Sequence, residues 1–183
     1  MWSDGRVASA KQGDNAWAAV EYGGFDNQWD NQLLGKFAIN FMPLEGLKFS
    51  AVVSPNITLS KTKVFEKAIP TYTAEDPTVF DTYIQDFNTT SLSEGNSQTY
   101  RLTNQFLINY NKNFGQHNLN LLAGFESFSS STENMGASRI NYELSDYPYL
   151  NLGPLDGRDN YGNAFENAYN SYFGRLIYDY NNK

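Results

Sequence analysis

Hydrophobic and polar residues alternate with a period of two along several parts of this chain. The clearest example runs from Leu47 to Ser60, where odd-numbered positions are apolar and even-numbered positions are polar, except for Val52. A period of two places successive side chains on opposite faces of an extended strand, whereas a helix repeats every 3.6 residues. Strands of globular proteins usually have about five or six residues, so this strand is unusually long. The pattern predicts an all-β fold.

Five such stretches predict five strands, at residues 32–42, 47–60, 98–112, 118–129 and 171–180. Turn residues separate the first strand from the second at Pro43 to Gly46, and the third from the fourth around Gly115. The other connections are much longer, at 1–31, 61–97 and 130–170. The expected topology is an antiparallel meander of about five long strands.

Three smaller features lie outside these strands. One turn of structure is expected from Asn15 to Glu21, and Asn181 to Lys183 reads as a further tight turn. In the second long connection, an acidic N-cap candidate precedes a proline, and apolar residues recur every four positions up to Phe87. This spacing predicts a short amphipathic helix that begins at Asp76.

Short and long connections follow one another in a regular order. Soluble domains rarely contain structureless connections this long, whereas outer-membrane barrels have short periplasmic turns and long extracellular loops. The asymmetry therefore predicts a segment of a transmembrane β-barrel. Aromatic residues near the short turns fit a membrane-interface girdle, although cross-strand packing in a soluble sandwich also accounts for them. These residues are Phe41, Phe49, Tyr110, Phe114, Tyr178 and Tyr180.

A barrel strand has one face toward lipid and the other toward the lumen. On this basis the lipid-facing set is Phe37, Ile39, Phe49, Val53, Leu102, Phe106, Ile108, Leu119 and Leu121. The lumen-facing set is Lys36, Asn40, Lys48, Asn56, Arg101, Gln105, Asn109, Asn120 and Arg175.

Exposed aromatic residues gather in two of the long loops. Their rings offer flat contact area that suits a sugar ring or a protein lid, and loop-on-loop packing is the structural alternative. The residues are Trp17, Tyr22, Phe25, Trp29, Tyr147, Tyr149 and Tyr161.

Composition narrows the function further. The net charge of −7 and the isoelectric point near 4.6 exclude a basic footprint for nucleic acid. A mean hydropathy of −0.55 argues against a helical membrane protein but is compatible with a barrel, whose lumen-facing residues are polar. The chain has no cysteine, which excludes disulfides, thiol catalysis and cysteine-based zinc sites.

Catalytic and metal-binding patterns are weak. His117 is the only histidine and lies in a turn, where a structural role is expected. The loop residues Asp156, Asp159 and Asn163 lack the spacing of an EF-hand. We therefore expect no enzyme, no cofactor and no metal site.

The segment from Asn109 to Asn120, followed by Leu122 to Glu126, resembles a recurring stretch of the SusC/RagA-like TonB-linked outer-membrane receptors of Bacteroidetes. There, a strand ending in Asn-Tyr meets a Phe-Gly-x-His turn and returns as a strand ending in Gly-Tyr-Glu. In this chain, Phe125 stands where tyrosine is commoner. Further similar stretches are 15–18, 44–48, 137–139, 147–151 and 171–180.

The resemblance implies a 22-stranded barrel closed by an N-terminal plug, which imports glycans or peptides with energy from TonB. It also implies a SusD-like surface lipoprotein as partner and outer-membrane lipid around the wall. No signal peptide opens the chain. We therefore expect residues 1–183 to be an internal barrel fragment, with the plug and the TonB-contacting segment upstream of Met1.

Two other functions remain open. One is a soluble extracellular β-sandwich that binds carbohydrate through its aromatic loops, and the other is a surface adhesin. A sandwich is expected to show turn signals every 8–12 residues at both ends. This chain shows them at one end only, which favours the transporter.

Overall fold

The computed structural model describes residues 1–9 and 15–181 and is built mostly of antiparallel β-sheet, so the expected all-β class is confirmed. Part of the expected loop 1–31 and part of the expected final turn at 181–183 lie outside the described residues. The elements are β1 (Val7–Ala8), α1 (Ala16–Tyr22), β2 (Gly24–Leu34), β3 (Phe37–Leu44), β4 (Leu47–Glu66), β5 (Pro70–Tyr72), β6 (Phe80–Tyr83), β7 (Ser91–Phe114), β8 (His117–Ile140), the 3-10 helix η1 (Leu150–Leu152) and β9 (Asp159–Tyr180).

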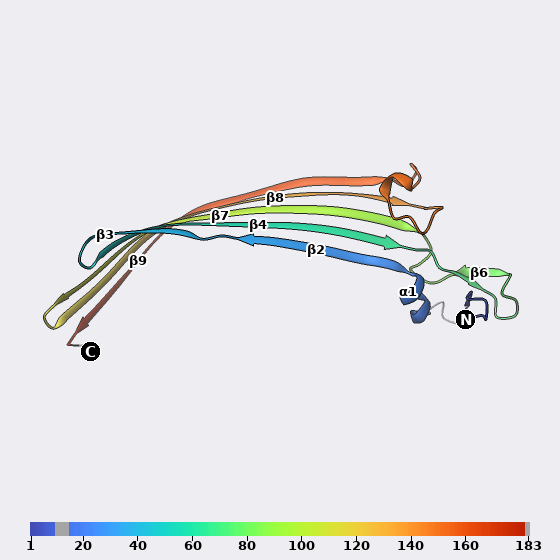
Figure 1. Ribbon diagram of the computed structural model, residues 1–183, viewed down its shortest axis with the longest axis horizontal. Coiled ribbons are helices and arrows are strands. Elements are labelled where there is room, and N and C mark those ends of the chain that lie inside the picture. Colours follow the sequence, from blue (N-terminus) through green and yellow to red (C-terminus); the bar gives the residue numbers. More distant parts are fainter. Residues whose placement is uncertain (10–14, 182–183) are drawn as a thin grey trace. The chain divides into compact units, whose positions relative to one another are not determined.

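The long strands form one sheet in the order β2-β4-β7-β8-β9, and β3 also pairs with β4 (Figure 1). Glu45–Gly46 is the two-residue turn between β3 and β4, and Gly115–Gln116 is the turn between β7 and β8. By contrast, residues 67–90 and 141–158 separate the other long strands. Short and long connections therefore alternate along the described chain.

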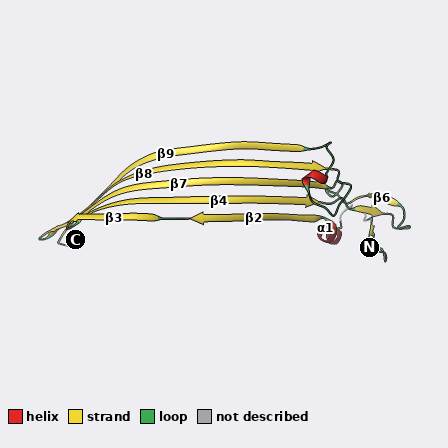
Figure 2. Cartoon of the chain, turned by 45° about the horizontal axis from the view of Figure 1, so that its top comes forward, coloured by secondary structure: helices red, strands yellow, loops and turns green. Residues whose placement is uncertain are grey.

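The edge of this sheet is interrupted between β2 and β3 (Figure 2). At the break, the amide of Gly35 donates a 2.9 Å hydrogen bond to the carbonyl of Pro55 in β4. Proline has no N–H, so Pro55 returns no hydrogen bond to the edge strand. The prediction of one continuous strand at 32–42 is wrong for this reason. These residues form the end of β2, the break and most of β3.

The register of β3 on β4 separates apolar from polar residues. Phe37 lies opposite Val53, and Phe41 lies opposite Phe49 with 6.5 Å between ring centroids. In the same ladder Asn40 lies opposite Ser50, whose hydroxyl donates a 2.7 Å hydrogen bond to the Asn40 side chain. Since side chains alternate along a strand, the two groups lie on opposite faces.

The strands extend further than the alternation predicts. β4 continues to Glu66, β7 begins at Ser91, β8 continues to Ile140 and β9 begins at Asp159, so the expected loops 61–97 and 130–170 are too long. Likewise, β2 lies mostly within the expected loop 1–31. These extensions lack a continuous apolar stripe, and the ladder hydrogen bonds of neighbouring strands hold them without one.

The expected turn of structure near Asn15 is confirmed as α1. The side-chain oxygen of Asn15 accepts a 3.1 Å hydrogen bond from the amide of Ala18, which is an N-cap. Gly23 ends the helix, and its amide donates to the carbonyl of Ala19.

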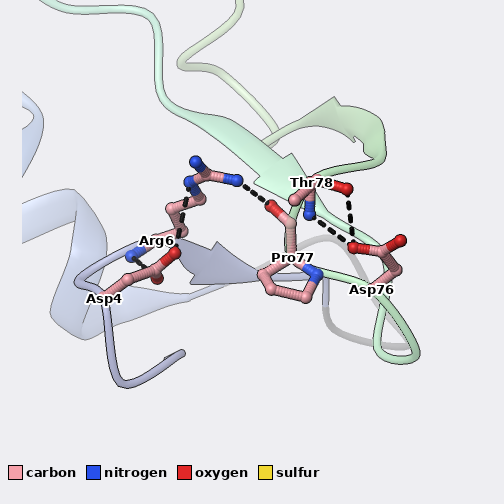
Figure 3. Close-up of polar contacts among 5 residues, drawn as sticks. All are labelled: Asp4, Arg6, Asp76, Pro77 and Thr78. Carbon is pink, nitrogen blue, oxygen red and sulfur yellow. Dashed lines mark hydrogen bonds and ion pairs between the residues drawn. The ribbon is translucent and has the colours of Figure 1, made fainter.

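The helix expected from Asp76 is wrong. Asp76 does accept hydrogen bonds from the amide and the hydroxyl of Thr78, at 2.8 and 2.7 Å, as a cap would (Figure 3). The chain then forms β6, which pairs with β5 instead of coiling. Pairing with a neighbouring strand overrides the local helical pattern, because propensity is weak beside tertiary contacts.

The chain divides into two compact units, each described by itself. The loop unit comprises Met1–Asp30, Ser60–Asn96 and Asn134–Asn163. It contains the small sheet β1-β5-β6 and two buried clusters, one of Val7, Ala18, Ile69 and Ile84, the other of Phe65, Leu92 and Tyr142.

The sheet unit comprises Asn31–Leu59, Ser97–Glu133 and Ala164–Lys183. Among its described apolar side chains Val52 is buried, but most of the large ones on the opposite face are exposed. The sheet unit is therefore a sheet with one open apolar face.

Candidate functional site

The nine residues expected to face lipid all lie in the sheet unit, on β3, β4, β7 and β8. Phe37, Ile39 and Phe106 are 69%, 75% and 56% exposed, while Leu119 is half-buried. The alternation places them on one face of their strands, and the β3–β4 register shows this directly for the first two strands. We call this surface the apolar face.

The apolar face continues onto β9 through aromatic contacts. The ring of Phe125 stacks on Phe106 with centroids 6.3 Å apart, and it lies 5.0 Å from the ring of Tyr172. Tyr172 is 83% exposed and is missing from the expected lipid-facing set. The signal is present in the sequence, because Tyr172 precedes Leu176, Tyr178 and Tyr180 at even spacing.

A hollow of about 270 Å³ lies on the apolar face where β3, β4 and β7 meet. Its apolar lining includes Ile39, Phe41, Phe49 and Ile108. Such a surface offers few polar groups to orient a polar ligand, so it suits hydrocarbon contact.

The opposite face of the sheet unit is polar. Gln105 donates a 2.6 Å hydrogen bond to Glu126, and the hydroxyl of Tyr169 donates a 3.3 Å hydrogen bond to the other oxygen of that carboxylate. Sequence reasoning missed three aromatic residues here: Phe173, and the pair Phe128 and Tyr169, whose rings stack with 4.9 Å between centroids. The ring of Phe173 in β9 lies over Gly124 of β8, where a side chain on Gly124 would overlap it.

The seven aromatic residues expected in the outer loops all lie in the loop unit. Two of them pack on each other, since Trp17 meets the edge of Tyr22 with 5.6 Å between centroids. Phe25 packs on buried Phe65 at 5.9 Å. For Trp17, Tyr22 and Phe25, the structure therefore shows loop-on-loop packing, the alternative to contact with a sugar or a protein lid.

Lysine side chains cover two more of these rings. The Lys61 ammonium lies 5.6 Å from the ring centroid of Trp29, and the Lys63 ammonium lies 5.2 Å from that of Tyr149. Lys63 also forms a 2.8 Å ion pair with Glu94. Sequence reasoning missed these cations, because they come from a strand that the alternation ended at residue 60.

The last two aromatic residues differ in their surroundings. Tyr161 lies over Gly136, where an added side chain would overlap its ring. Tyr147 is 56% exposed, and no ring contact of its side chain occurs among residues 1–9 and 15–181. Nearby, burial raises the pKa of the Tyr142 hydroxyl, which donates to the Tyr149 carbonyl at 3.3 Å. Tyr147 is therefore one of the loop aromatic residues that remain available to a partner.

A cavity of about 600 Å³ in the loop unit brings together residues from segments far apart in the sequence. Tyr22 and Phe25 line it, as do Arg6, Lys67 and Asp146. Lys67 and Asp146 form a 2.7 Å ion pair there. The cavity thus combines two expected aromatic residues with charged groups that no sequence pattern singled out.

Catalytic and metal groups do not converge in the described residues. Within 1–9 and 15–181, no three His, Asp or Glu side chains are placed to hold a metal ion. His117 hydrogen-bonds Tyr178 at 2.6 Å between its Nδ1 and the hydroxyl, and its ring lies 5.0 Å from that of Tyr180. In the part of the chain described, no helix is long and apolar enough to span a membrane.

The structure matches solved chains that share its sheet. One, described as the RagAB peptide transporter, matches over 85% of this chain with a TM-score of 0.70 and 18% identity. This chain is similar in fold to part of RagAB. Two further structures show the RagAB importer in its open-open state, with a TM-score of 0.70 and 18% identity, and in its closed-closed state, with 0.66 and 19%.

The match to RagAB confirms, at the level of fold, the resemblance to SusC/RagA-like receptors that residues 109–126 indicate. Each comparison covers 85% of this chain but only 16% of the RagAB chain. No protein-family model and no curated protein sequence matches the chain studied here.

Proposed function

We propose that this chain is part of the barrel wall of a TonB-dependent outer-membrane transporter, which imports glycans or peptides together with a SusD-like surface lipoprotein. The observation that carries the proposal is the apolar face, with Phe37 and Ile39 exposed at 69% and 75%. Contiguous apolar surface left open to water marks an interaction site. Lipid hydrocarbon covers such a face in a barrel, whose outer band is apolar.

The loops provide the second part of the proposal. In it, exposed aromatic residues such as Tyr147 contact the lipoprotein or the transported ligand, while Trp29 and Tyr149 shape that surface with their lysine partners. RagAB is described as a peptide importer, which supports peptides as one substrate class. In this proposal, the energy for import comes from TonB.

The soluble sandwich is the less favoured alternative. A sandwich buries its inner face against a second sheet, with the two about 10 Å apart. Among the described residues of the sheet unit, no second layer covers Phe37, Ile39 or Phe106. A barrel wall needs no such layer, and the proposal includes no catalytic step.

Spin labels test the proposal directly. One cysteine replaces Phe106 and, in a separate variant, one replaces Gln105, in a cysteine-free form of the protein that contains this chain, reconstituted in lipid. We expect the label at 106 to collide with oxygen, which partitions into lipid, and the label at 105 to be shielded from it. If neither label senses lipid, the barrel proposal is wrong.

A further inference from the structure

The tripeptide Asp-Gly-Arg occurs twice in this chain, at residues 4–6 and 156–158. Both copies lie in the loop unit. An aspartate that precedes a glycine is open to a reaction within the backbone, because glycine has no Cβ to hinder attack of its amide nitrogen on the aspartate side chain. Since the three residues are identical in the two copies, a difference in reactivity between them arises from their surroundings.

The reaction is an isomerisation of aspartate, and water is its only other reactant. The glycine nitrogen attacks Cγ of the protonated aspartate side chain, a C–N bond forms, and the carboxyl hydroxyl leaves with the amide proton as water. The product is a five-membered succinimide ring, whose nitrogen is bonded to both carbonyl carbons. Water then opens the ring. Cleavage of the nitrogen bond to Cγ restores aspartate, whereas cleavage of the bond to the main-chain carbonyl carbon gives isoaspartate, in which the backbone runs through Cβ and Cγ.

In the first copy, hydrogen bonds hold both reacting groups. Asp4 Oδ1 accepts a 3.1 Å hydrogen bond from the amide of Arg6, and Asp4 Oδ2 lies 3.4 Å from Nε of the Arg6 guanidinium (Figure 3). The amide of Gly5 donates a 3.1 Å hydrogen bond to the carbonyl of Trp2. The carboxyl group and the nitrogen that would attack it must therefore both break existing contacts before they can react.

The second copy lies in an exposed turn before β9. Asp156 and Gly157 are both exposed. With residues 1–9 and 15–181 the Asp156 carboxylate makes no hydrogen bond or ion pair, and the Gly157 amide donates to no backbone carbonyl there. Within the described chain, neither reacting group is held away from the other.

The fold requires the glycine of this reactive pair. Gly157 has a φ of 75°, in the left-handed region that glycine adopts without strain. A Cβ added to Gly157 would overlap the side chain of Ile140, at the end of β8. A larger residue at position 157 would slow the reaction, but the backbone angle and the contact with Ile140 both oppose it.

We propose that Asp156 is a site of spontaneous isomerisation in the folded protein and that Asp4 is protected from it. Conversion lengthens the main chain by one carbon between residues 156 and 157 and leaves a carboxylate as a branch. The change falls at the contact of Gly157 with Ile140, shortly before β9 begins at Asp159. It is therefore expected to loosen the connection between β8 and β9. This inference is independent of the proposed barrel function.

Ageing of the whole protein that contains this chain, in detergent at physiological temperature and pH, tests the site. An isoaspartyl methyltransferase detects the product, and peptide mass spectrometry locates it, since the modified peptide keeps its mass but changes its retention and fragmentation. We expect isoaspartate to form about five times faster or more at Asp156 than at Asp4, the factor that corresponds to one exposed ion pair and one backbone hydrogen bond. After unfolding in urea, equal rates are expected, because the two tripeptides are identical.

Two matched arginine variants test the protection of Asp4. Arg6→Ala removes the guanidinium beside Asp4 and is expected to raise isoaspartate at position 4. Arg158→Ala makes the same change in the second copy and is expected to leave the rate at position 156 unchanged. In Asp156→Glu the longer side chain does not form the five-membered ring, so the product at position 156 is expected to be lost.

Equal rates at the two positions in the folded protein, or no reaction at Asp156, would overturn the proposal. Because the whole protein is used, a partner of Asp156 that lies outside this chain would appear as the second of these outcomes. An unchanged rate at position 4 in Arg6→Ala would reject the protection of Asp4 by Arg6.

Discussion

The amide of Asn111, near the end of β7, donates a 2.8 Å hydrogen bond to the carbonyl of Gly46 in the turn between β3 and β4. Gly46 has a φ of 83°, and a side chain there would overlap the backbone carbonyl of Asn111. The turn of one hairpin is thus fixed against the backbone of the next strand. Position 46 therefore requires glycine for two reasons: the positive φ angle, and the lack of space for a Cβ atom.

Gly46→Ala is therefore expected to destabilise the protein more than Gly115→Ala. Gly115 occupies the other short turn with a φ of 68°, but a Cβ added there would meet nothing within 4 Å. The left-handed backbone costs alanine about 1–2 kcal/mol at either site, and overlap at Gly46 adds about 1–3 kcal/mol. Urea unfolding in detergent micelles measures both. Equal losses at the two turns would contradict the close approach of β7.

Two neighbouring positions on β7 test which face meets lipid. Ile108→Lys places a charge on the apolar face and is expected to lower the free energy of unfolding in phospholipid bilayers by about 1–2 kcal/mol, less than the cost at the bilayer midplane because Ile108 lies two residues from Tyr110 of the expected interface girdle. Asn109→Lys, one residue later and on the polar face, is the matched control. A larger loss at position 109 than at 108 would reverse the assignment of faces.

Two loop aromatic residues are expected to differ in role. Phe25 packs on buried Phe65, so Phe25→Ala is expected to cost about 2–4 kcal/mol of stability. Tyr147 is exposed, so Tyr147→Ala is expected to change stability by less than about 0.5 kcal/mol and to weaken lipoprotein or ligand binding. Thermal unfolding and pull-down of the co-expressed surface lipoprotein measure the two effects. Unchanged capture by Tyr147→Ala would remove this residue from the proposed contact surface.

The ion pair of Lys63 and Glu94 is partly buried, with side-chain exposures of 17% and 29%. We expect a coupling free energy of about 0.5–1 kcal/mol, in the upper part of the range for surface pairs. A double-mutant cycle with Lys63→Met and Glu94→Gln measures it. Lys63 also makes a cation–π contact with Tyr149, which is separate from the ion pair. Tyr149→Leu is therefore expected to remove that contact without abolishing the coupling free energy between Lys63 and Glu94. Additive single effects would show that the pair contributes nothing.

Asp76 gives a pH-dependent prediction. Hydrogen bonds from the backbone and side chain of Thr78 hold the pKa of the Asp76 carboxyl below its ordinary 3.8. A lowered folded-state pKa means that the stabilisation is present above the ordinary value and is lost as the pH falls through the lower one. At neutral pH, Asp76→Ala is expected to speed hydrogen exchange across residues 73–79, whereas Glu75→Ala, an adjacent exposed acid, is not. Equal exchange in the two variants would rule out this role for Asp76.

The alternation from Leu47 to Leu59 determined the all-β class, the two faces and the short turns, because a period of two needs only neighbouring residues to define it. The same local logic placed a turn of structure at Asn15, which caps α1, while contact of the apolar set with lipid stays a prediction. The SusC/RagA-like resemblance rested equally on local stretches. These features depend on residues close together in the chain, so the sequence is sufficient to find them.

Only the tertiary structure decided what depends on partners distant in sequence. Pro55 of β4 breaks the edge strand at Gly35 because it lacks an N–H to return, and β5 draws the segment after Asp76 into a strand. The polar ends of β7, β8 and β9 are strands because their neighbours satisfy their backbone hydrogen bonds, which leaves no periodic trace in the side chains. The contacts of Lys61 with Trp29 and of Lys63 with Tyr149 could not be predicted from the sequence either. They depend on how segments distant in sequence are placed side by side, which tertiary pairing and register determine.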